Sequence, residues 1–289
     1  MKVHLVISFR LLTVVLSVII ILNCSQDKST DRINLSALDA PISTHYSPAA
    51  ESQAHSIQGM LREAAEYYEE TLGVEAEITA AVVDASDWSE ITNVPYGLPG
   101  VTGSPPLVYF PADNDHELFR LLKSTIQESE LPSCLLMPPD SLAHQFVWLI
   151  GFHELGHVYA SEYGLNRPNR WVYEFQASYL AYAYLRERHP GMASLWQQTS
   201  HLLANQIQPA HTSLEDFEEM YVRVGIENYS WYQGVFQQRV HEVYNTRGLD
   251  FIREMKNVTW SQPEEVYFIN VLQELDPGFV SWAEKYGLE

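Results

Sequence analysis

The sequence predicts an α+β fold, in which a small, mostly antiparallel sheet with one helix precedes a mainly helical lobe. Three observations predict it. Helical spacing of apolar residues opens the chain's globular part, two stretches of strand composition follow, and nearly all apolar spacing after residue 113 is helical. We expect one domain over 49–289, with an α/β part at 49–138 and a helical part at 139–289.

The first 23 residues have the layout of an export signal. Lys2 and Arg10 precede the apolar run LLTVVLSVIIIL, which gives way to polar residues. A retained membrane anchor is the less favoured alternative, because Arg10 leaves the uninterrupted run short of a bilayer span. The motif Ile21-Leu22-Asn23-Cys24 resembles the lipobox of bacterial lipoproteins. This resemblance implies an exported protein anchored in the cell envelope through a lipid on Cys24.

Residues 24–48 are polar and lack any helical or alternating apolar period, which predicts a flexible tether. The chain has 17 basic and 37 acidic residues, giving a formal net charge of -20. Nucleic acids and anionic membrane surfaces are therefore poor partners, and we expect membrane contact only through the lipid anchor or the signal segment. Besides Cys24 only Cys134 is present, so no internal disulfide is available when Cys24 is acylated.

The α/β part is predicted element by element. A helix over 49–72 ends at Gly73, and the stretch 78–88 (ITAAVVDASDW) is a strand that ends in turn formers. A loop rich in proline and glycine leads into a second strand, LVYF at 107–110, whose flanking prolines favour an edge position. A helix over 116–129 completes this part.

The next predicted helix, over 141–160, is apolar but contains the sequence HELGH. His153 and His157 are four residues apart, which places both imidazoles on one face of the helix, able to reach one metal ion, with Glu154 beside them. The alternative is a metal-free, structural HELGH that arose by chance. A bound metal is favoured because burying two histidines and a glutamate without a partner costs free energy.

A catalytic zinc site has three protein ligands and an open position for water, so a third ligand is required. The sequence after His157 lacks the glycine and third histidine of HExxHxxGxxH, and Glu162 is too close on the same helix. Tyr163-Gly164 ends that helix, Pro168 opens the next, and its residues Trp171 to Arg188 include Glu174.

Glu174 is the best candidate for the third ligand. It shares a helix face with the small residues Ala177, Ser178 and Ala181, which would let the two helices pack closely. The alternative is an exposed helical glutamate, which its apolar and aromatic neighbours in the sequence disfavour.

HELGH followed by WVYEFQAS at 171–178 resembles the gluzincin zinc metallopeptidases, the group that includes thermolysin and the zinc aminopeptidases. The resemblance implies one Zn²⁺ per chain, bound by His153, His157 and Glu174, and a peptide or protein substrate. It implies that Glu154 is the general base that deprotonates the zinc-bound water. It also implies an edge strand that aligns the substrate backbone, and LVYF lies upstream where that strand is expected.

Two roles found in gluzincins have no matching residue here: the one that orients a histidine ligand and the one that stabilises the oxyanion. Where thermolysin-like enzymes have an aspartate that orients a histidine ligand, this chain has Ser178, which becomes the candidate for that role. Gluzincins also use a tyrosine or histidine to stabilise the oxyanion. Tyr232 and Tyr229, in the stretch NYSWYQG, are the candidates, with His241 a third, and packing is the alternative role of the tyrosines. No sequence for gripping a free amino terminus is present, so aminopeptidase specificity is not predicted.

The sequence thus favours a zinc metallopeptidase. The main alternative is a cell-surface binding or scaffold lipoprotein that keeps the gluzincin fold without turnover. Glu154 favours the enzyme, because a site that only binds metal does not need it.

Overall fold

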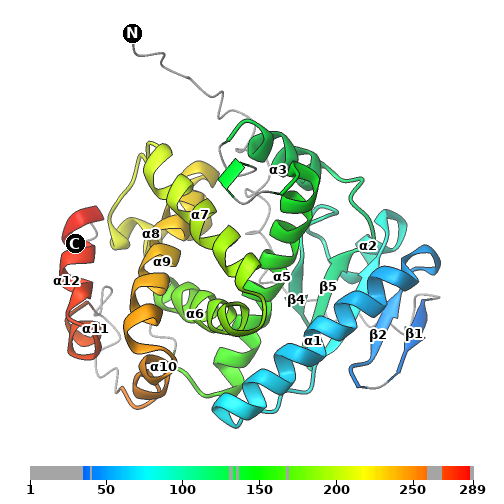
Figure 1. The fold of residues 1–289 in the computed structure, drawn as a ribbon, viewed down its shortest axis with the longest axis horizontal. Helices are drawn as coiled ribbons and strands as arrows, with labels where there is room; N and C mark the ends of the chain where they lie inside the picture. The colour runs from blue at the N-terminus through cyan, green and yellow to red at the C-terminus, as the bar shows by residue number, and fades with distance from the viewer. Residues whose placement is uncertain are drawn as a thin grey trace.

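The computed structural model describes residues 35–39, 41–129, 133–134, 137–166, 169–258 and 269–286. The predicted signal segment, Cys24 and Pro168 lie outside these residues. Within the described part of the chain, no helix is both long enough and apolar enough to cross a membrane. The α+β class is confirmed: a five-stranded sheet near the start of the described chain is followed by a mainly helical part (Figure 1).

The sheet is mixed rather than mostly antiparallel. Its strands are β1 (Ser36–Leu38), β2 (Thr44–Tyr46), β3 (Thr79–Val83), β4 (Gly100–Thr102) and β5 (Leu107–Pro111), in the order β1-β2-β3-β5-β4. The pairs β1/β2 and β4/β5 are antiparallel, whereas β2/β3 and β3/β5 are parallel. Strands β3 and β5 are almost entirely buried, as parallel strands covered on both faces are. The prediction of a mostly antiparallel sheet was therefore wrong. Unbroken apolar runs are compatible with parallel and with antiparallel pairing, so the sequence pattern does not decide between them.

The prediction of an edge position for LVYF was also wrong, because β5 lies between β3 and β4. Its prolines stand at the strand ends, where a missing N–H interrupts no ladder hydrogen bond. The edge strand beside it is β4, and β4 contacts the helix that carries HELGH.

The predicted tether does not hold for residues 36–38 and 44–46, which form β1 and β2. Strand β2 pairs in parallel with β3, and its residues Thr44 and Tyr46 are buried. Three residues are too few for an alternating pattern to stand out in the sequence, and the pairing depends on a partner strand more than thirty residues away.

The helices of the first part are α1 (Glu51–Leu72), α2 (Ala85–Ile91) and α3 (Glu117–Gln127). The predicted helices at 49–72 and 116–129 are confirmed, and Gly73 adopts the left-handed conformation (φ 65°) that ends α1. Helix α2 was not predicted. It begins because the Asp84 side chain accepts hydrogen bonds from the backbone N–H groups of Ser86 and Asp87, so the strand ends at Val83.

The helical part has one central pair of helices. Its elements are α5 (Pro139–Glu162), α6 (Arg170–Arg188), α7 (Pro190–Gln206), α8 (Leu214–Met220), the 3-10 helix η5 (Tyr221–Val224), α9 (Ile226–Arg247), α10 (Asp250–Met255), α11 (Ile269–Leu275) and α12 (Gly278–Tyr286). Helix α5 lies between the sheet and the remaining helices and packs on α3, β4, β5, α6 and α7 (Figure 1). Helix α6 packs between α5 and α9 and is buried over nearly its whole length. The elements with HELGH and Glu174 are therefore adjacent in the core.

Candidate metal centre

Helix α5 brings three polar side chains of HELGH together. One nitrogen of His153, one of His157 and one carboxylate oxygen of Glu154 lie within 4.8 Å of one another, so they could hold a metal ion. The two imidazole rings are 4.8 Å apart between centroids, as expected for side chains one helical turn apart. His157 is buried, while His153 and Glu154 are intermediate in exposure.

Glu174, on α6, completes the group from the opposite side. Its Oε2 atom lies 3.1 Å from His153 Nε2 and 3.9 Å from His157 Nε2, and the residue is 2% exposed. Zinc bonds of about 2.0–2.1 Å in tetrahedral geometry place ligand atoms about 3.3 Å apart. The distances from Oε2 to the two nitrogens, 3.1 and 3.9 Å, are close to this spacing, so the carboxylate oxygen and the imidazoles are near enough to share one metal ion.

The carboxyl groups of Glu154 and Glu174 differ in their protonation. Burial raises the pKa of Glu154 to about 7, and the negative charge of Glu174 adds to this although His153 opposes it. Burial also acts to raise the pKa of Glu174, but the hydrogen bond with His153 and the positive charge of His157 overcome it and lower the value to about 2. Glu174 is thus an anion suited to bind a cation, and Glu154 can exchange a proton near neutral pH.

The same environment acts on His153. Burial alone would lower the pKa of this imidazole, but the hydrogen bond and the negative charge of Glu174 together raise it above its ordinary value. The buried carboxylate therefore attracts positive charge to this point, whether the charge is carried by a proton or by a metal ion.

Helices α5 and α6 approach closely because residue 156 is glycine. A Cβ atom on Gly156 would lie 2.2 Å from the carbonyl oxygen of Ala177. Any residue other than glycine at this position would therefore force the backbone to move. The imidazole of His157 stacks on the ring of Tyr173 at 3.9 Å between centroids. Of the small residues predicted on the Glu174 face, Ala177 and Ser178 thus lie at the contact between the two helices, which lets the carboxylate reach the histidines.

Ser178 lies beside His153, where the sequence placed a residue that orients a histidine ligand. Its Oγ is 3.1 Å from His153 Nδ1. A metal ion would replace the Nε2 proton that His153 shares with Glu174, and Nδ1–H would then donate to this hydroxyl, leaving the lone pair of Nε2 for the metal. The hydroxyl fixes the ring orientation without adding the negative charge that an aspartate would.

Two residues that contact Glu174 were missed by the sequence prediction. The hydroxyl of Tyr221 donates a hydrogen bond to Glu174 Oε1 at 2.5 Å, and the Gln233 amide donates to Oε2 at 3.0 Å. Tyr221 is one of 17 tyrosines and stands in no recognised motif. Gln233 belongs to the stretch NYSWYQG, in which the sequence favours the tyrosines as site residues.

Of the tyrosines predicted at the site, only Tyr229 lies there. Its hydroxyl accepts a hydrogen bond from Gln233 at 3.0 Å, and burial, with the charges of Glu174 and Glu154, raises the pKa of this phenol. Tyr232 is fully buried and donates to the backbone carbonyl of Ser213 at 2.6 Å, so it serves packing.

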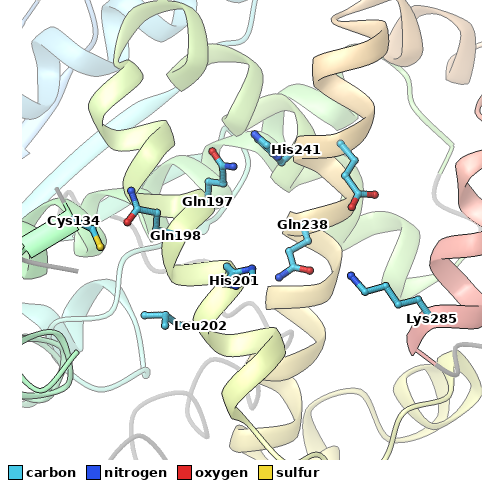
Figure 2. A pocket seen from close by; sticks show the side chains of 9 residues that line it. Cys134, Gln197, Gln198, His201, Leu202, Gln238, His241 and Lys285 are labelled. Carbon is cyan, nitrogen blue, oxygen red and sulfur yellow. The ribbon is translucent and has the colours of Figure 1, made fainter. Parts of the chain in front are cut away.

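His241, the third candidate, lies elsewhere. It lines a pocket between α7 and α9 together with side chains such as Gln197, His201, Gln238 and Lys285 (Figure 2). None of the residues of the metal group lines this pocket. The pocket is therefore not part of the proposed chemistry.

Comparison of the chain with protein-family models, with curated proteins and with solved structures finds no match. The resemblance to gluzincins accordingly rests on HELGH, on Glu174 and on the geometry that joins them.

Proposed function

We propose that this protein is a zinc-dependent metallopeptidase in which His153, His157 and Glu174 bind the metal. The observation that carries the proposal is the convergence of two imidazole nitrogens and an anionic carboxylate oxygen, from two helices, at distances of 3.1 and 3.9 Å. Two histidines and one glutamate are a ligand set found in catalytic zinc sites, where the fourth position stays open. The exposure of His153 and Glu154 supports such an opening.

Glu154 is the proposed general base. Its carboxylate belongs to the same group as the two histidines, with an oxygen within 4.8 Å of a nitrogen of each, so it is placed to take a proton from water and give it to the leaving amine. A zinc ion bound here would polarise the substrate carbonyl and make the water more acidic. Tyr229 is the better placed of the two tyrosines predicted to stabilise the oxyanion, because its hydroxyl adjoins Gln233 and Glu174.

Strand β4 is the proposed guide for the substrate backbone. It is the last strand of the sheet, pairs on one side with β5 and contacts α5. An extended peptide could add to its other side by backbone hydrogen bonds, which would bring a peptide bond toward HELGH. The resemblance implied this role for LVYF at 107–110. Because β5 is not an edge strand, we assign the role to residues 100–102 instead.

We further propose that the protein is exported and anchored through a lipid on Cys24. This part of the proposal rests on the sequence of residues 1–24 alone. Mass spectrometry of the membrane fraction would detect the acylated amino-terminal peptide, and a mature chain that begins elsewhere would contradict the anchor.

The metal is tested by elemental analysis of the purified protein. We expect about one zinc ion per wild-type chain and a clear loss in Glu174→Gln, which removes the anionic ligand but keeps its shape. Glu162→Gln is the matched control, because Glu162 lies on the same helix as HELGH but is exposed. Absence of zinc from the wild type after incubation with Zn²⁺ would leave the metal-free interpretation of HELGH.

Turnover is tested with a mixed peptide library, comparing the wild type with Glu154→Gln. Cleavage by the wild type alone would support catalysis, because the variant keeps all three proposed ligands. If both proteins bind zinc and neither cleaves any peptide, the non-catalytic binding or scaffold protein becomes the better interpretation.

A further inference from the structure

The two carboxylate oxygens of Glu174 have different neighbours. Oε2 faces both imidazoles and accepts from the Gln233 amide at 3.0 Å. Oε1 accepts from the Tyr221 hydroxyl at 2.5 Å. A carboxylate can bind a metal through one oxygen or through both, so a hydroxyl held on one oxygen influences which of these occurs.

Tyr221 reaches Glu174 from an unusual backbone position. It is the first residue of η5, directly after α8, with φ 48° and ψ −104°, and among the described residues it is the single non-glycine residue with positive φ. A bulky residue adopts such a conformation only where its surroundings enforce it, and residues of this kind gather at functional sites.

Tyr221 is held by contacts between α8 and the start of α6, the helix that carries Glu174. Glu218, on α8, accepts hydrogen bonds from the backbone N–H groups of Arg170 at 3.0 Å and Trp171 at 2.7 Å. The Arg170 guanidinium donates back to the Glu218 carbonyl at 2.8 Å and lies over the Tyr221 ring, 5.1 Å from its centroid. The contacts of Glu218 and Arg170 therefore hold Tyr221 against the first turn of α6, one turn before Glu174.

We propose that Tyr221 is a positioning residue that makes Glu174 a one-oxygen ligand. By occupying Oε1, its hydroxyl leaves Oε2 as the metal-binding atom, and Gln233 orients that oxygen. Binding through both oxygens would add a metal bond and fill the position that water needs. The inference rests on the proposed metal site, but it concerns how the site is shaped rather than whether it exists.

The test compares metal binding by the wild type, Tyr221→Phe, Gln233→Met and Tyr232→Phe. Zn²⁺ affinity is measured by competition with a chromogenic chelator, and coordination is followed by the visible absorption of Co²⁺, which is stronger for four-coordinate than for five- or six-coordinate ions. Tyr232→Phe is the matched control, because it also removes a buried hydroxyl that donates at 2.6 Å, but to a backbone carbonyl. Circular dichroism confirms that each variant is folded.

For Tyr221→Phe we expect zinc affinity to fall about 10- to 100-fold and Co²⁺ absorption to weaken, with neither change in Tyr232→Phe. Gln233→Met should lower the affinity while keeping strong absorption, because Tyr221 still holds Oε1. If Tyr221→Phe does not fold, Gln233→Met still tests whether Oε2 binds the metal while Oε1 stays with Tyr221. Weakened Co²⁺ absorption in Gln233→Met would contradict this assignment. Unchanged binding and spectra in Tyr221→Phe, or equal losses in Tyr232→Phe, would overturn the inference while leaving the metal site intact. No zinc binding by the wild type would instead refute the proposed function.

Discussion

Gly156 is the residue of HELGH that contributes no side chain, yet it determines whether the other residues can meet Glu174. A methyl group added at this position would lie closest to backbone atoms of Ala177, at 2.2 Å and 2.9 Å, which cannot turn aside as a side chain can. Relieving this clash would require α5 and α6 to separate. Because His157 and Glu174 lie on either side of the contact, separation would also widen the metal group.

We therefore expect Gly156→Ala to lower the free energy of unfolding by about 1–3 kcal/mol and to weaken zinc binding. Gly59→Ala is the control, because Gly59 lies inside α1 with nothing within 4 Å of its added methyl group. That change should be neutral or stabilising, by up to about 1 kcal/mol. Urea unfolding and zinc titration measure both effects. Full zinc affinity in a destabilised Gly156→Ala would show that the helix contact does not shape the metal group.

At this scale the sequence predicted the residues whose spacing is local and missed those that arrive by tertiary folding. His153, Glu154 and His157 follow from one helical turn, and Glu174 from the next helix and its small neighbours. Tyr221 lies 47 residues from Glu174, and Gln233 lies 59 residues away. Nothing in their own sequence surroundings indicates a carboxylate partner, because only the folded chain brings them to Glu174.

Among the elements, α3 begins at a histidine that must stay neutral. His116 is 2% exposed, and its Nδ1 accepts the backbone N–H of Phe119 at 3.1 Å, which a protonated ring could not do. Burial lowers the pKa of His116 to about 4, although Asp113 and Asp115 act to raise it and Arg120 assists in lowering it. The start of α3 is thus sensitive to acid.

The direction in which pH changes the free energy of unfolding follows from the unfolded chain, where a histidine has a pKa of about 6.5. Between pH 6.5 and pH 4 the unfolded state binds a proton that the folded state does not, so the free energy of unfolding falls as the pH falls. We expect His116→Asn, which keeps a capping acceptor but cannot titrate, to lose about 2 kcal/mol less than the wild type between pH 7 and pH 5. Urea unfolding at both pH values measures the difference. Equal losses in the two proteins would contradict a neutral, buried His116.

The elements also show where sequence patterns stop being informative. The helices at 51–72, 117–127, 139–162 and 170–188 were predicted because their apolar spacing and end signals are local. Strand order was not, because β5 pairs with β3 on one side and β4 on the other, and both partners depend on how the chain crosses over. Prolines beside a strand therefore indicate where it ends more reliably than whether it lies at an edge.

At the scale of the whole molecule, helices α11 and α12 are held against α9, the helix that carries Gln233. Arg239 on α9 forms an ion pair with Asp276, which precedes α12, and the two side chains are only 5% and 14% exposed. Asp276 also accepts the backbone N–H of Gly278 at 2.9 Å, and the guanidinium lies 4.3 Å from the ring centroid of Phe279. One buried pair thus joins the segment between α11 and α12 to α9.

Breaking this pair should cost far more than breaking an exposed one. Among the described residues, Asp276→Asn leaves only Glu242, at 3.1 Å, to balance the buried charge of Arg239, so we expect the free energy of unfolding to fall by about 3 kcal/mol. Glu66→Gln is the control, because its pair with Arg62 spans 3.6 Å and both side chains are more than half exposed; its loss should stay below about 0.5 kcal/mol. Urea unfolding measures both variants, and limited proteolysis would detect early release of 269–286 in Asp276→Asn. If the two variants were equally stable, the pair would not be what holds α11 and α12 on α9, and the aromatic packing around Phe279 would have to account for their attachment.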